Sequence, residues 1–139
     1  MNMSQSFFVP GPLPGLNEML AWAKRQGHSV GRKGKRWGLY AQEKKSWEDL
    51  IIVAIRQARL RPILAPVVIQ YEWVEANRRR DKSNIAAGKK LIEDTLVRAG
   101  VLMGDGWRDV VGFADSFAVD KKRPGVRVSI REAEVRVGH

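Results

Sequence analysis

Two aspartates and a lysine near the middle of the chain have side chains suited to metal-assisted phosphate chemistry. Asp81 follows a run of three arginines, and Asp105 lies between two glycines. Carboxylates bind hard divalent cations through oxygen, and a lysine such as Lys90 can neutralise charge on a reacting phosphate. The stretch from Asn77 to Asp105 therefore predicts a metal-dependent phosphodiesterase.

Basic residues around these side chains predict contacts with a nucleic-acid backbone. The chain carries 25 Lys and Arg against 15 Asp and Glu, a net charge of +10. A charge of this sign and size favours a polyanionic partner, with nucleic acid first. Residues 24–36 combine basic residues with three glycines and predict a phosphate-contacting arm, with a solvated surface loop as the alternative. The predicted DNA contacts are Arg78, Arg79, Arg80, Lys82, Lys89, Arg32, Lys33, Lys35 and Arg36.

The available metal-binding side chains restrict the choice of ion. The chain has no cysteine, and only His28 and His139 could supply imidazole. A bound metal must therefore be held by oxygen, which favours Mg²⁺ and allows Mn²⁺ to substitute. No apolar run approaches the roughly 18 residues that span a bilayer, so we expect no membrane partner.

The hydrophobic patterning predicts one domain over residues 1–139, of the α/β (α+β) class, with helices packed on a mixed sheet. A chain of this length is too short for two ordinary domains. A basic turn over 121–125 is expected to return the chain as a strand. Strands are predicted over 5–9, 67–76, 108–119 and 126–130, and helices over 16–23, 37–60 and 84–99.

The helix over 84–99 separates the two aspartates and carries the lysine. Its apolar residues Ile85, Leu91 or Ile92, Leu96 and Ala99 are expected to face the core, while Lys90, Asp94 and Arg98 follow one side. Packing of this helix back onto the sheet would bring Asp81 and Asp105 together. Two alternatives remain open: Asp81 as a helix-start residue that neutralises the arginines, and Lys90 as one step of a surface salt-bridge ladder.

The order and spacing of these motifs resemble those of the RusA-type Holliday junction resolvases of bacteria and their phages. Residues 79–84 read Arg-Arg-Asp-Lys-Ser-Asn, with Lys90 and Asp94 next in a helix and Asp105 after Ala-Gly at 99–100. Residues 12–18, PLPGLNE, are similar to the family's N-terminal segment, and residues 105–117 and 126–128 to its C-terminal strands.

This resemblance implies a homodimeric, Mg²⁺-dependent endonuclease that resolves four-way DNA junctions by paired nicks. It would act in DNA recombination and repair, in the cytoplasm of a bacterial or phage-infected cell. Asp81 and Asp105 would be metal ligands, and Lys90, or its neighbour Lys89, would be the cation on the phosphate.

One position departs from the family pattern. Ser83 stands where the family has a second metal-binding aspartate, and a serine hydroxyl is a poor Mg²⁺ ligand beside a carboxylate. Ser83 is instead suited to cap the helix predicted to begin near Asn84. Three explanations remain open: an inactivating substitution, a naturally weakened enzyme, or compensation by Asp94, Asp109 or Asp115. The alternative function is a catalytically inactive protein, derived from such a nuclease, that binds branched DNA.

Overall fold

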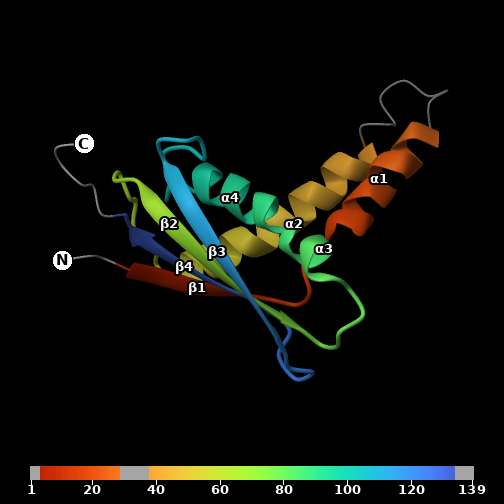
Figure 1. Cartoon of the computed structure of the whole chain (residues 1–139). Helices are drawn as coiled ribbons and strands as arrows, with labels where there is room; N and C mark the ends of the chain where they lie inside the picture. The colour runs from red at the N-terminus through yellow and green to blue at the C-terminus, as the bar shows by residue number, and fades with distance from the viewer. Residues whose placement is uncertain (1–3, 29–37, 134–139) are drawn as a thin grey trace.

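The computed structural model describes residues 4–28 and 38–133, and it has a mixed four-stranded sheet with helices on one face (Figure 1). This confirms the predicted α+β class and single small domain. In chain order the elements are β1 (Ser4–Pro10), α1 (Leu16–His28), α2 (Gly38–Gln57), β2 (Val67–Glu75), α3 (Lys82–Ala86), α4 (Lys89–Arg98), β3 (Val110–Val119) and β4 (Gly125–Glu132).

The sheet has the strand order β1-β4-β2-β3. Strand β4 runs antiparallel to both β1 and β2, whereas β3 runs parallel to β2 and forms the edge. The predicted return of the chain through a basic turn is correct, although β3 and β4 do not pair with each other, because β2 lies between them. A turn signal fixes a change of direction, while strand neighbours depend on which apolar faces pack together.

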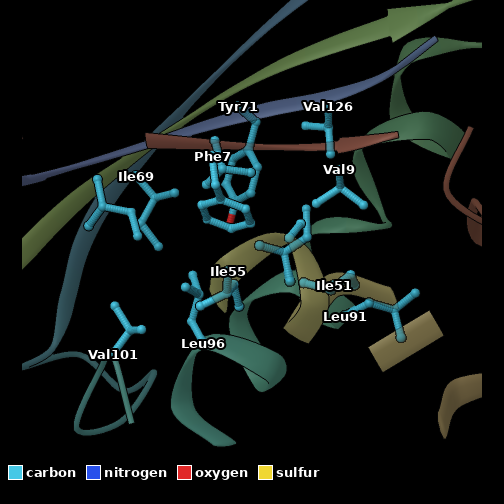
Figure 2. Packing of buried hydrophobic residues seen from close by; sticks show 14 of the residues in the cluster. Phe7, Val9, Ile51, Ile55, Ile69, Tyr71, Leu91, Leu96, Val101 and Val126 are labelled. Carbon is cyan, nitrogen blue, oxygen red and sulfur yellow. The ribbon is translucent and has the colours of Figure 1, made fainter. Parts of the chain in front are cut away.

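Alternation along β2 determines which face of the sheet is covered. Ile69, Tyr71 and Trp73 are buried, and the intervening Gln70 and Glu72 are exposed, as the strand periodicity predicts. Figure 2 shows the buried side chains of the sheet meeting those of the helices, including Ile51 and Ile55 of α2 and Leu91 and Leu96 of α4. Burial of this one face holds α4 against the sheet.

The helix predicted over 84–99 is two helices, α3 and α4, separated at Ala87 and Gly88. A Cβ on Gly88 would lie 3.1 Å from the carbonyl oxygen of Pro14, so the N-terminal segment approaches closely at the break. Both Leu91 and Ile92 are buried, where the sequence left a choice between them.

Two other predictions need correction. Helix α1 continues to His28, so residues 24–28 of the predicted loop are helical. Leu50, an apolar residue within the helix predicted over 37–60 whose pattern suggested burial, is 55% exposed, because the buried stripe of α2 runs through Ile51, Ala54 and Ile55. Among the described residues, no helix combines the length and the apolar character needed to cross a bilayer.

Candidate functional site

Lys90, Asp94 and Asp105 form an exposed ion cluster, here called the Lys90 cluster. The Lys90 ammonium lies 2.5 Å from Asp105 Oδ2 and 3.2 Å from Asp94 Oδ1. The hydrogen bond to Asp105 raises the pKa of Lys90, and the same bond lowers the pKa of Asp105, to which Asp94 adds a smaller lowering. Both partners are therefore charged at neutral pH, and the Lys90 side chain remains 65% exposed.

The C-terminus of α4 positions the loop that carries Asp105. Gly100 has φ +78°, its N–H donates to Val97 O, and the Val101 N–H donates to Leu96 O. This is the Schellman arrangement, which favours glycine in the left-handed position. Val101 also accepts a hydrogen bond from the Ile63 N–H at 2.8 Å, so the loop begins from a fixed point.

The glycines of the loop that carries Asp105 have two different structural roles. Gly100, rather than Gly104 or Gly106, has the positive φ in this loop. Gly104 is required for a close approach, because a Cβ there would lie 2.7 Å from Asp109 Oδ2. Asp109 therefore packs beside this loop.

The structure separates the two candidate lysines. Lys89 Nζ lies 2.7 Å from Asp115 Oδ2 and 3.9 Å from the centre of the Phe113 ring, and its side chain is mostly buried. Asp115 also accepts a hydrogen bond from Trp73 Nε1 at 2.8 Å. Lys89 thus ties α4 to β3, and Lys90 is the lysine that reaches Asp105.

A buried acid that the sequence pattern did not predict lies next to the Lys90 cluster. Glu93 is 8% exposed and accepts a hydrogen bond from the Tyr71 hydroxyl at 2.9 Å. Burial raises the pKa of Glu93, against lowering effects of that hydrogen bond and of Lys90 and Lys89. Burial, and then Glu93, raise the pKa of Tyr71, so its hydroxyl stays a donor.

Asp81 caps α3, as the structural alternative proposed. Its Oδ1 accepts a hydrogen bond from the Asn84 N–H at 2.8 Å. Helix α3 therefore begins at Lys82, and the prediction that Ser83 is the cap is wrong. Asn84 is buried, and its Oδ1 accepts from the Asn17 N–H at 2.9 Å, which joins the N-terminal segment to this motif.

Asp81 and Ser83 line an open pocket of about 990 Å³ at the end of β2, here called the β2–α3 pocket. Cations and apolar side chains share its wall, and Lys82 Nζ lies 5.7 Å from the centre of the Phe117 ring. The lining residues are Glu75, Asn77, Arg78, Arg80, Asp81, Lys82, Ser83, Ile85, Phe117, Ala118 and Val119. Asp105 is not among them, so a shared site of Asp81 and Asp105 stays a prediction.

Arg80 has an internal role that the sequence did not reveal. Its guanidinium donates to both carboxylate oxygens of Glu75, at 3.0 and 2.8 Å, and to Glu18 Oε1 at 2.9 Å. A fourth bond goes to Leu13 O, so most of its five donors are used. The bond to Glu75 raises the pKa of Arg80. We call Arg80, Glu75 and Glu18 the Arg80 cluster, which joins the end of β2 to α1.

The other predicted DNA contacts fall into two groups, one on the surface of the described part of the chain and one outside the described residues. Arg78, Arg79 and Lys82 are exposed, with Arg78 and Lys82 lining the β2–α3 pocket. These three side chains are available to a polyanion. Arg32, Lys33, Lys35 and Arg36 lie outside the described residues.

The donor chemistry of the Lys90 cluster fits Mg²⁺. Asp94 and Asp105 already share one cation, the Lys90 ammonium, and Mg²⁺ needs only one or two protein carboxylates because it keeps several waters. The described residues contain no group of three His, Cys, Asp or Glu that could hold a metal. Of the compensating acids considered from sequence, Asp94 is the one joined to Asp105.

Comparisons with protein-family models and with curated proteins find no match for this chain. Membership of the RusA-type family therefore remains an expectation based on the motifs in the sequence.

Proposed function

We propose that this protein is a Mg²⁺-dependent, structure-specific endodeoxyribonuclease that resolves four-way DNA junctions by paired nicks. The observation that carries the proposal is the exposed Lys90 cluster, in which two carboxylates share one exchangeable cation. The net charge of +10 and the exposed Arg78, Arg79 and Lys82 support a polyanionic substrate. Such an enzyme would work in the cytoplasm of a bacterial or phage-infected cell.

Each side chain has a distinct part in this proposal. Asp105 and Asp94 would hold Mg²⁺, which supplies an activated water and neutralises phosphate charge when bound. Lys90, which both carboxylates now hold, would stabilise the negative charge that develops on the phosphate. Arg78 and Lys82 would fix the DNA backbone beside the β2–α3 pocket. Asp81 would remain the cap that orients α3 and contribute its second oxygen toward the pocket.

The test is cleavage of a labelled four-way junction in Mg²⁺ or Mn²⁺. We expect paired nicks, a loss of about 100-fold with Asp105→Asn, and greater activity with Ser83→Asp, which places a carboxylate where the resembled family has a metal-binding aspartate. A matched control is Asp49→Asn, because Asp49 is also an exposed partner of a lysine, Lys45, at 3.1 Å. Equal cleavage by wild type, Asp105→Asn and Asp49→Asn would exclude this site.

A second candidate is a protein that binds branched DNA without cutting it. The specific observation in its favour is Ser83, an uncharged side chain that lines the β2–α3 pocket at the position where the resembled family has a metal-binding aspartate. Under this alternative, wild type and Ser83→Asp bind the junction with similar affinity in a gel-shift assay and neither cuts it. Cleavage that appears only with Ser83→Asp would instead identify a nuclease weakened at this position.

A further inference from the structure

Trp107 lies almost entirely in solvent, in the loop between α4 and β3 (Figure 1). It is 98% exposed, the highest value among the large apolar residues of the described part of the chain. Burial of a tryptophan ring is one of the larger gains available to a folding chain. The fold takes no such gain from Trp107, so the ring is free to contact a ligand.

The other tryptophans of the described residues have packing roles. Trp73 is 2% exposed. Trp22 packs edge-on against Tyr40, with 6.1 Å between the ring centres, and Trp47 packs against the hydrophobic core. At its level of exposure, Trp107 cannot have such a role.

A hydrogen-bonded turn holds Trp107 in this position. The Asp109 and Val110 N–H groups both donate to Gly106 O, at 3.1 and 3.0 Å, which closes the chain around Trp107. The Val67 N–H donates to Asp109 O at 2.9 Å and so fixes the turn to β2. The ring is therefore presented by an anchored turn, and little further ordering of the backbone is needed when a ligand binds.

Basic side chains accompany Trp107. Arg108 follows it directly and is exposed. Asp105, two residues before it, is bound by Lys90, whose side chain is 65% exposed. An aromatic ring with cations beside it suits a nucleotide, because the base stacks on the ring and the phosphate attracts the cations.

The surroundings of Trp107 favour a nucleobase over a protein partner. Residues 104–109, GDGWRD, hold no other apolar side chain. A protein-binding surface usually has a contiguous apolar patch, whereas stacking on a base needs only one aromatic face. The net charge of +10 also favours a polyanion.

We propose that Trp107 stacks on a nucleobase that lacks a stacking neighbour at the centre of a branched DNA, while Arg108 contacts a phosphate of the same strand. Bases inside a duplex are stacked on both faces, and exposing one costs least where pairing is already lost. Trp107 therefore selects branched DNA over fully paired duplex and positions one strand beside the Lys90 cluster. This inference rests on the DNA substrate of the proposed function but not on cleavage.

The test is equilibrium binding of the full chain in EDTA, since removal of the divalent metal stops the proposed cleavage. Fluorescence anisotropy compares two fluorescein-labelled four-way junctions of one sequence, one intact and one with abasic nucleotides at the crossover. The abasic junction keeps every phosphate and lacks the bases that Trp107 would contact. Trp107→Ala removes the ring, and Trp107→Phe retains an aromatic face. Leu64→Ala is the matched control, because Leu64 is also an exposed apolar residue outside the helices and strands, at 80%.

We expect Trp107→Ala to bind the intact junction about tenfold more weakly than wild type, with Trp107→Phe and Leu64→Ala close to wild type. On the abasic junction, wild type and Trp107→Ala should bind equally.

Equal binding of the intact junction by wild type and Trp107→Ala would overturn the stacking and point to a protein partner for this turn. An equal loss on both junctions would also overturn it, because the contact would then be to the backbone. A wild type that binds neither junction would overturn the proposed function together with this inference.

Discussion

The Lys90 and Arg80 clusters each join one cation to two carboxylates. They differ in how exposed the cation is and in how many hydrogen bonds it makes. Lys90 is 65% exposed and makes single contacts with Asp94 and Asp105. The Arg80 side chain is only 20% exposed and binds Glu75 through two parallel bonds. A partly buried bidentate pair is costly to separate, whereas an exposed lysine exchanges partners readily. Function is therefore expected at Lys90 and stability at Arg80.

The largest expected effect is on cleavage, through Lys90→Met. This change removes the ammonium and keeps the length of the side chain. We expect single-turnover cleavage of the junction to fall about 100-fold, with less than about 1 kcal/mol lost from the free energy of unfolding. Lys45→Met is the matched control, since Lys45 is 67% exposed and pairs with Asp49. A Lys90→Met protein that cuts like wild type would remove Lys90 from the proposed mechanism.

Arg80→Ala should give the complementary result. We expect a loss of about 2 kcal/mol in the free energy of unfolding, measured by urea denaturation, because Glu75 would keep a poorly solvated charge without its partner. Arg78→Ala is the control, since Arg78 is exposed and such changes usually stay within about 0.5 kcal/mol. Weaker junction binding by Arg80→Ala at unchanged stability would instead make Arg80 a DNA contact.

The contrast between these clusters shows which features of the structure could be predicted from the sequence. The alternation of β2 and the apolar stripe of α4 predicted the sheet, its covered face and the helix that presents Lys90, because burial of apolar surface imposes those periods. The same reasoning grouped Arg80 with Arg78 and Arg79. Adjacent arginines look alike in sequence, and only the fold brings Glu18 and Glu75 to one of them.

Other features required contacts between distant segments. The predicted helix is interrupted at Ala87 and Gly88, where Pro14 from a distant part of the chain approaches Gly88. The buried Glu93 accepts a hydrogen bond from the Tyr71 hydroxyl, and no local sequence pattern predicts that pair. The strand order could not be derived either, since β3 and β4 are consecutive in the chain yet separated by β2.

Gly100→Ala tests whether the end of α4 positions the Lys90 cluster. With φ at +78° a Cβ is strained, although no atom lies within 4 Å of it, so we expect a loss of about 1 kcal/mol on urea denaturation. Gly106→Ala in the same loop is the control, because Gly106 has neither a positive φ nor a neighbour within 4 Å. Equal stability of the two variants would show that the loop adapts without the left-handed residue.

The smallest effect concerns Glu93, which lies close to the Lys90 cluster but is buried. Burial raises the pKa of Glu93 above its ordinary value of 4.5, so the folded protein holds this proton more tightly than the unfolded chain does. Stability is then lost as pH rises from the unfolded pKa through the folded one. Glu93→Gln keeps an acceptor for Tyr71 and cannot ionise.

We therefore expect Glu93→Gln to gain stability relative to wild type as the pH rises above 4.5, by urea denaturation at each pH. Glu72→Gln, on the exposed face of β2, is the control. A relative stability of Glu93→Gln that does not change with pH would mean that Lys89 and Lys90, whose charges favour the ionised acid, offset its burial. In that case the Lys90 cluster also stabilises the fold, and its role would differ from that of the Arg80 cluster only in degree.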